Sequence, residues 1–442
     1  MSLKKHPGLK VIDHWLNYQL AQGDIPGFQV SIRLRGDLSF SKAYGYADLK
    51  NKEQYTRAHL GRIASQSKTF TGALTLWLNS RGQIDLNEHL VNILTEFKNH
   101  KDPKFKRIKI IDLLTHRSGI FRDSIDTDYW GKREPFLTRT DLTNEIASSR
   151  LIYSPGLFTK YSNLGYGLLG LALERCSGKK FATLIREFFA EKDLDSNIIV
   201  DSDINGNFSH GYLRRQMHGQ KFKQISHRTT QALCPAAGFC SNTDSTTDFF
   251  HKLYLTSSIL PKQQRTLLHS KKWPVKNMKS EYYGIGTIFT DVAGDPCVGH
   301  SGGFPGFASQ TWVELKTKRT YGFIANTSIT KTFNAIQSMA VILRAIDNNF
   351  PSSSWSSLIV SKPLADNYTS TVYVIGKSKA LAIPLTGWMP ADDLMIFSRY
   401  KNHYLSNQIC GYKNVGEPLT FNIKDGTVIA AQFGGFVSKI AK

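Results

Sequence analysis

Hydrophobic and polar positions near the start of the chain follow first the period of a helix and then that of strands. The amphipathic segment from Val11 to Leu20 predicts a helix. Two β-patterned stretches follow, Phe28 to Leu34 and Leu38 to Tyr44, with Arg35-Gly36-Asp37 between them. A short, glycine-containing connection of this kind predicts a β-hairpin.

The pattern then becomes helical for a long segment before strands return. Apolar residues recur at spacings of three and four from Phe70 to Leu78, and residues 86–269 are mostly of helical pattern, broken by Gly, Pro and Asn loops. A further helix is expected from about 331 to 347. Strand patterns return over 283–289, 309–314 and 320–326.

Strands at both ends of this region enclose the helical segment, so the strands of one sheet are expected to come from distant parts of the chain. We predict one discontinuous α/β (α+β) domain over residues 1–348, with a helical lobe of about 86–269 inserted in the α/β lobe. The crevice between two such lobes is a natural place for a functional site.

The C-terminal part has a different character. Residues 349–360 are rich in serine and predict a linker. Beyond it, short strand-like runs separated by Gly, Asp and Asn turns predict a small all-β domain over 361–442, a sheet or a barrel.

Composition limits the classes of protein that fit. A chain of 442 residues is long enough for two domains, and 41% apolar with 21% charged residues is ordinary for a globular protein. No run of 18 or more apolar residues occurs, so we predict no membrane span. The N-terminal stretch has no apolar signal-peptide core. An exported location would therefore require that a leader had been removed, and a cytoplasmic one is expected otherwise.

The formal net charge of +21 favours attraction to a polyanion, such as an anionic cell-envelope polymer or an acidic membrane surface. Specific nucleic-acid binding is disfavoured, because the basic residues are dispersed and show neither zinc-finger nor RNP-type spacing.

The five cysteines are odd in number and lack Cys-x-x-Cys spacing, so buried free thiols are expected. Cys234 and Cys240 are the one pair close enough in sequence to consider as a short-loop disulfide. The 13 histidines include no His-Glu-x-x-His motif, and we predict neither a metal nor a cofactor.

Ser65 and Lys68 form a Ser-x-x-Lys motif at the start of the helix that continues through Phe70 to Leu78. A spacing of three places hydroxyl and amine on one helix face, about a turn apart, so a neutral amine could take the hydroxyl proton. Lys68 lies in the first turn of a helix whose other face is apolar, where desolvation lowers a lysine pKa. Five other pairs share the spacing without this context: Ser2/Lys5, Ser39/Lys42, Ser177/Lys180, Ser328/Lys331 and Ser398/Lys401.

Two further motifs lie in the two lobes. Tyr161-Ser162-Asn163 precedes a helix-patterned run, and His300-Ser301-Gly302-Gly303 ends a strand-like stretch. Neither is specific alone, but the order and placement of the three motifs together are rare by chance.

With these motifs the chain resembles the serine β-lactamase and penicillin-binding-protein family, specifically its class C and esterase-like branch. The resemblance runs from about residue 10 to 348 and includes Leu113-Leu114-Thr115-His116-Arg117-Ser118-Gly119. It implies an antiparallel sheet flanked by helices beside a helical lobe, and a cofactor-free enzyme acting on a small-molecule or peptide substrate.

The resemblance also implies roles for individual residues. Ser65 looks like the acylated nucleophile, Lys68 like its partner, and Tyr161 like the residue that carries the proton to the leaving group. Asn163, His300, Ser301 and Gly302 would bind substrate, and the backbone N–H groups of Ser65 and Gly303 would form the oxyanion hole. Which of Lys68 and Tyr161 takes the first proton is left open. His116 and Arg117 are interpreted as structural, with a catalytic role as the alternative.

The departure from the family pattern is at His300, where β-lactamases of this branch usually have the lysine of Lys-Thr-Gly. A histidine is largely neutral at pH 7 and cannot draw in a carboxylate in the same way. We therefore expect a serine hydrolase of esterase or D-peptidase type. The alternatives are a true class C-like β-lactamase and a catalytically silent penicillin-binding or ligand-sensing protein.

Overall fold

The computed structural model describes residues 6–124, 127–131, 135–204, 206–215, 220–278, 280–328, 332–367, 369–386, 394–407 and 415–440. It divides into two compact units, one formed by residues 25–332 and the other by the segments before and after them. All residues of the three motifs belong to the first of these units.

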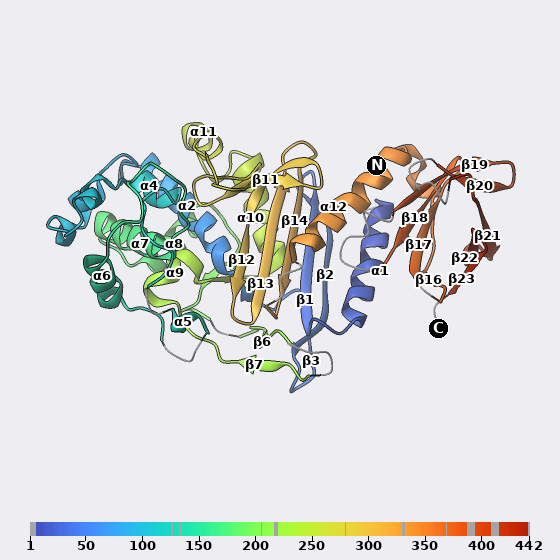
Figure 1. Ribbon diagram of the computed structural model, residues 1–442, viewed down its shortest axis with the longest axis horizontal. Helices are drawn as coiled ribbons and strands as arrows, with labels where there is room; N and C mark the ends of the chain where they lie inside the picture. The colour runs from blue at the N-terminus through green and yellow to red at the C-terminus, as the bar shows by residue number, and fades with distance from the viewer. Residues whose placement is uncertain are drawn as a thin grey trace. The chain divides into compact units, whose positions relative to one another are not determined.

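A nine-stranded antiparallel sheet forms the centre of the 25–332 unit (Figure 1). Its order is β3-β2-β1-β14-β13-β12-β11-β10-β9, so the N-terminal hairpin pairs directly with a strand almost 300 residues later. The predicted antiparallel sheet and hairpin are confirmed. The strands are β1 (Gly27–Leu34), β2 (Asp37–Asp48), β3 (Glu53–Gln54), β9 (Trp273–Pro274), β10 (Tyr282–Tyr283), β11 (Ile288–Val292), β12 (Asp295–Phe304), β13 (Phe307–Glu314) and β14 (Arg319–Ala325).

The strand expected over 283–289 is interrupted, and the reason is steric. Gly286 has φ of +66°, and a Cβ there would lie 2.2 Å from the carbonyl oxygen of Lys68. The chain therefore makes a tight turn against the start of α2, and separate strands, β10 and β11, lie on either side of it. Thr69 Oγ1 donates to Gly286 O at 2.7 Å and fixes this contact.

Helices and short strands account for most of the chain between β3 and β9. Figure 1 shows α4, α6, α7, α8 and α9 gathered to one side of the sheet. The helices are α2 (Ser67–Ser80), α3 (Leu90–Ile93), α4 (Ile110–Leu114), α5 (Asp128–Gly131), α6 (Arg139–Ser148), α7 (Asn163–Ser177), α8 (Phe181–Glu191), α9 (Cys234–Ala237), α10 (Thr243–Leu255) and α11 (Lys262–Ser270), with 3-10 turns at η2 (Ala64–Gln66), η3 (Thr95–Phe97), η4 (Pro103–Arg107) and η5 (Gln231–Leu233). The short strands are β4 (Gly61–Arg62), β5 (Ile199–Val200) and β8 (Phe239–Ser241), which pair together, and β6 (Gly211–Leu213) with β7 (Lys223–Ile225).

Two helices of this segment connect the helical region to the sheet. α10 packs against β1, β13 and β14, although its sequence lies inside the 86–269 segment expected to form the lobe. Phe70 of α2 stacks on Phe249 of α10 at 4.1 Å and on Phe239 of β8 at 5.1 Å between ring centroids. This aromatic cluster anchors α2 in the core, with the Ser-x-x-Lys motif at its N-terminal end.

The second unit contains a closed, eight-stranded barrel, which confirms the predicted small all-β domain. β17 pairs with both β16 and β18, and this pairing closes the sheet, with β15 at its side. Leu364, Phe397 and Leu419 are among its fully buried core residues. The strands are β15 (Ile359–Val360), β16 (Leu364–Ala365), β17 (Ser370–Ile375), β18 (Lys379–Pro384), β19 (Met395–Tyr400), β20 (His403–Ser406), β21 (Pro418–Lys424), β22 (Thr427–Phe433) and β23 (Phe436–Ile440).

Two long helices complete the chain, α1 (Pro7–Ala21) and α12 (Thr332–Asn349), and both were expected from the sequence. A 3-10 helix, η6 (Ser352–Ser357), lies within the segment expected to be a linker. The domain borders expected at 348 and 360 stay predictions. Nowhere in the described ranges is a helix both long and apolar enough to cross a membrane.

Candidate active site

Ser65 lies in the single turn η2, directly before α2, and Lys68 lies in the first turn of α2. The distance from Lys68 Nζ to Ser65 Oγ is 3.5 Å. Ala64, which precedes the serine, has φ of +49°, a left-handed conformation that non-glycine residues seldom adopt. The backbone thus turns sharply just before the serine, whose side chain stays partly exposed while Gln66, Ser67 and Lys68 are buried.

Lys68 is held by two acceptors from other elements. Its Nζ donates to Asn163 Oδ1 at the start of α7 and to the carbonyl oxygen of Ala236 in α9, each at 2.8 Å. Burial lowers the pKa of Lys68 well below its ordinary value; Asp123 opposes this shift and Arg122 adds to it. With two amine hydrogens used in this way, a neutral Lys68 has its lone pair available for the hydroxyl of Ser65.

Tyr161 lies beside this pair. The Lys68 Nζ is 4.6 Å from the centroid of its ring. Burial raises the pKa of the Tyr161 phenol above its ordinary value, and a hydrogen bond with Ser65 opposes that shift. The phenol therefore stays protonated near neutral pH, as a proton donor requires.

Asn163 is bonded to protein groups at both ends of its amide. Its Oδ1 accepts from Lys68, and its Nδ2 donates to Asp123 Oδ1 at 2.8 Å. The same carboxylate oxygen accepts from Trp130 Nε1 at 2.9 Å. In this structure Asn163 orients Lys68, and its expected contact with substrate stays a prediction.

His300 is buried in β12, and both of its ring nitrogens form hydrogen bonds. Nδ1 lies 2.5 Å from the carbonyl oxygen of Ser301, which can only accept, so Nδ1 carries the proton. Nε2 then accepts from the hydroxyl of Tyr283 at 3.0 Å. Burial is the main cause that lowers the pKa of His300 to about 3, with the nearby Lys68 amine as a smaller cause, although the hydrogen bond to Ser301 opposes this shift. The imidazole is neutral at pH 7, and the predicted role in substrate binding remains untested.

The glycines after His300 bring β12 close to η2, the turn that bears Ser65. A Cβ at Gly302 would lie 2.1 Å from the carbonyl oxygen of Ile63, so a side chain is excluded there. At Gly303 a Cβ would meet nothing within 4 Å, and this residue is exposed. β12 packs against η2, which brings the backbones of Gly303 and Ser65 onto neighbouring elements. Their role as an oxyanion hole stays a prediction.

Several residues of the site escaped the sequence analysis. Asp123 comes from a loop without regular spacing, and Ala236 contributes only its backbone oxygen, which no side-chain pattern reveals. Tyr283 lies in a strand pattern typical of core residues. Their proximity to Lys68 and His300 depends on long-range packing alone.

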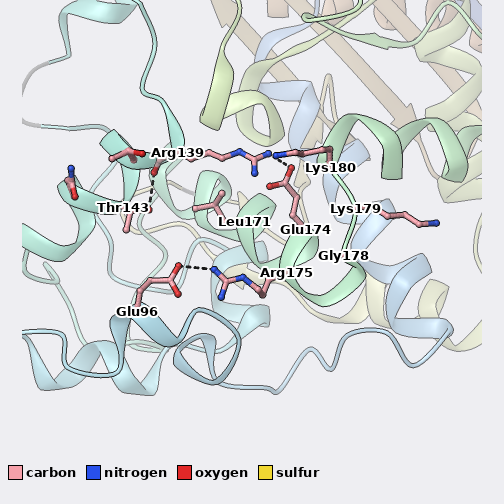
Figure 2. Close-up of a pocket in the computed structure, with 11 residues that line it drawn as sticks. Glu96, Arg139, Thr143, Leu171, Glu174, Arg175, Gly178, Lys179 and Lys180 are labelled. Atoms are coloured by element: carbon pink, nitrogen blue, oxygen red, sulfur yellow. Dashed lines mark hydrogen bonds and ion pairs between the residues drawn. The ribbon is translucent and has the colours of Figure 1, made fainter.

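Outside the Ser65 site, a cavity and side chains of metal-binding types are further candidates for chemistry. The cavity, of about 530 Å³, lies along α6 and α7. Figure 2 shows that Arg139 pairs with Glu174 and Arg175 with Glu96 in its lining, so these charges neutralise one another. No site residue lines it. The described histidine, cysteine and carboxylate side chains form no group of three suited to a metal.

The cysteines within the described ranges are free thiols, and Cys234 and Cys240 form no disulfide. Cys240 and Cys297 are buried as expected, but Cys176 is exposed and Cys234 partly so. Cys410 lies outside the described residues.

Solved structures define the class of fold. The octameric penicillin-binding protein homologue from Pyrococcus abyssi matches with a TM-score of 0.65 at 18% identity, covering 97% of this chain and 99% of that one. A D-amino acid amidase from Ochrobactrum anthropi SV3 matches with a TM-score of 0.64 at 22% identity, covering 78% and 99%. The chain has a penicillin-binding-protein-like fold.

The sequence then places the chain within a family. Residues 12–345 match the model of the family described as Beta-lactamase, and the chain belongs to that family. Protein flp of Staphylococcus aureus strain N315 is 31% identical over 174 residues, which are 39% of this chain and 34% of that protein. A probable fimbrial assembly protein FimD of Dichelobacter nodosus is 26% identical over 170 residues, 37% and 41% of the two chains. These alignments span less than half of the curated relatives.

Proposed function

We propose that the chain is a serine hydrolase that forms an acyl-enzyme at Ser65 on an ester, an amide or a peptide containing a D-residue. The observation that carries the proposal is the buried amine of Lys68, held by Asn163 and Ala236 within 3.5 Å of the partly exposed Ser65 hydroxyl. The D-amino acid amidase and penicillin-binding protein homologue named above support this reaction class.

In the proposed acylation, Ser65 Oγ attacks the acyl carbonyl carbon and its proton passes to the neutral amine of Lys68. The carbonyl oxygen becomes an oxyanion that the N–H groups of Ser65 and Gly303 stabilise. We assign the first proton to Lys68 rather than to Tyr161, because the lysine pKa is lowered whereas the phenol pKa is raised.

Collapse of the intermediate breaks the bond to the leaving group, which takes the proton of the Tyr161 hydroxyl. Lys68 then returns its proton to Tyr161, so both groups end in their starting states. Water attacks the acyl-enzyme by the same sequence in reverse and releases the acid, which restores Ser65.

A burst assay with p-nitrophenyl acetate tests the proposal, run beside a D-amino acid amide and nitrocefin. We expect a burst of nitrophenol in the wild type and in Ser67→Ala, and none in Ser65→Ala. Hydrolysis of the amide would define an amidase or peptidase, and efficient nitrocefin turnover a β-lactamase. The absence of both burst and turnover in the wild type would overturn the proposal and favour a silent binding protein.

A further inference from the structure

His116, in the loop after α4, contacts Tyr161 and both of its neighbours in the chain, Lys160 and Ser162. Its carbonyl oxygen accepts from Lys160 N at 2.6 Å, and its Nδ1 accepts from Ser162 N at 3.1 Å. Between these two bonds its ring packs on the ring of Tyr161, with centroids 4.2 Å apart. One residue thus contacts the phenol ring with its side chain and fixes the backbone on both sides of Tyr161, with its carbonyl oxygen on one side and its ring nitrogen on the other.

The backbone of His116 is adapted to this position. Its φ of +57° lies in the left-handed region, which histidine enters more readily than bulky apolar residues do. Gly119 follows with φ of +78°, so the loop reverses direction within a few residues. This turn lets the carbonyl group and the ring of one residue reach the same short segment.

The hydrogen bonds also define the tautomer and the protonation state of the His116 imidazole. Because Nδ1 accepts a backbone N–H, the proton of the neutral imidazole is on Nε2, which has no hydrogen-bond partner among the described residues. Burial lowers the pKa of His116 well below its ordinary value, and the nearby Lys68, His300 and Lys160 side chains lower it further in their protonated forms. A protonated ring would turn Nδ1 into a donor facing the Ser162 N–H, so the contact requires the neutral form.

We propose that His116 is a positioning residue for Tyr161, which keeps the phenol hydroxyl aligned with Ser65 during proton transfer. The inference rests on the proposed function of Tyr161 as proton carrier. A displacement of about 1 Å at a reacting group can cost on the order of 10²-fold in rate. The rings of Tyr166 and Tyr283, at 5.1 and 4.4 Å between centroids, hold His116 from its other sides.

Two variants of His116 remove its hydrogen-bond acceptor and its ring packing separately. His116→Asn keeps an acceptor at the position of Nδ1 and tolerates positive φ, but removes the ring. His116→Phe keeps a ring but removes the acceptor. We expect each to lower kcat for p-nitrophenyl acetate by about 10- to 100-fold and to change KM by less than about threefold, because the lost alignment acts on the transition state.

The decisive measurement repeats His116→Asn in a Tyr161→Phe background. A residue that acts through Tyr161 has nothing left to position there, so the fold-change should shrink to less than about twofold. His100 provides the matched control: its buried ring stacks on Phe105 at 4.1 Å, and its Nδ1 accepts from Asp102 N at 3.0 Å. His100→Asn should lower thermal stability with kcat unchanged.

Equal fold-changes for His116→Asn in both backgrounds would overturn the inference, as would kcat of wild-type level in both single variants. Failure of the proposed function gives a different result, because the wild type itself would then show no burst. If His116→Phe does not fold, the Asn variant and its double mutant still decide the question.

Discussion

At the scale of single residues, the proposed site depends on a lysine that its surroundings keep neutral. Lys68 is fully buried, yet its amine has two acceptors at 2.8 Å, so burial removes the charge without leaving the nitrogen unsatisfied. The same residue type on an exposed helix face would stay protonated and could not accept the Ser65 proton.

Replacing Tyr161 by Phe tests its proposed role as the proton carrier. We expect Tyr161→Phe to lower kcat by on the order of 10²-fold or more, the usual effect of losing a positioned acid or base, with little change in thermal stability. Tyr254→Phe is the matched control, because that buried hydroxyl donates to Thr287 Oγ1, which belongs to none of the three motifs. Steady-state kinetics of both variants measure the effect. A near-normal kcat in Tyr161→Phe would exclude a role for Tyr161 in proton transfer.

His300 gives a prediction for stability against pH. Its pKa is about 3 in the folded chain and near 6.5 when unfolded, so below pH 6.5 the unfolded state binds a proton that the folded state does not. Stability from this group is complete above pH 7 and is lost as pH falls towards 3.

The loss should reach about 2 kcal/mol between pH 7 and pH 5. In His300→Gln, whose amide oxygen can still accept from Tyr283, this part of the pH dependence should disappear. Urea unfolding of wild type and variant at both pH values measures the difference. Parallel pH profiles would show that His300 does not have a lowered pKa.

At the scale of elements, the turn between β10 and β11 supports the start of α2. We expect Gly286→Ala to destabilise the fold by more than about 2 kcal/mol, because it adds a clash with the Lys68 carbonyl to the cost of a left-handed alanine. Gly82 has a similar φ of +69° with nothing within 4 Å of a Cβ. Gly82→Ala should therefore cost only about 1 kcal/mol.

Urea unfolding and the burst amplitude check both variants. The Gly286→Ala variant should lose activity together with stability, since its clash falls on the backbone of Lys68 at the start of α2. Equal destabilisation of the two glycine variants would contradict a tight contact at this turn.

The elements also show what could be predicted from sequence. Ser65 and Lys68 are one helical turn apart, so spacing alone predicted their proximity. The acceptors of Lys68 come from α7 and α9, about 95 and 168 residues away, and only packing brings them together. The interrupted strand at 283–289 was missed for the same reason, because the contact of Gly286 with Lys68 is not local. α10 has an ordinary helical pattern, and its place on the sheet is likewise a tertiary property.

At the scale of the whole molecule, every residue of the proposed site belongs to the 25–332 unit, and the closed barrel contributes none. The expected attraction of the +21 chain to an anionic envelope polymer stays a prediction. The barrel domain could be foreseen as β-rich from its short strand patterns, but its closure through β17 and β18 depends on pairing that a sequence pattern does not specify.

Core variants in the two units should therefore differ in their effect on activity. Phe397→Ala, in the barrel core, should cost about 3–5 kcal/mol in the stability of that unit and leave the burst amplitude of folded protein unchanged. Phe70→Ala should reduce the amplitude, because Phe70 anchors the helix of Lys68. Calorimetry combined with burst kinetics measures stability and activity of both variants. Loss of the burst in folded Phe397→Ala would contradict the assignment of the site to the 25–332 unit alone.

The most direct test of the central claim is intact-mass and peptide mass spectrometry after reaction with a fluorophosphonate probe. We expect one adduct, on the peptide that contains Ser65, in the wild type and in Ser67→Ala, since Ser67 Oγ is buried and accepts from Phe239 N at 3.0 Å. Ser65→Ala should remain unlabelled. An adduct that persists in Ser65→Ala, or that vanishes in folded Ser67→Ala, would contradict the assignment of Ser65 as the nucleophile.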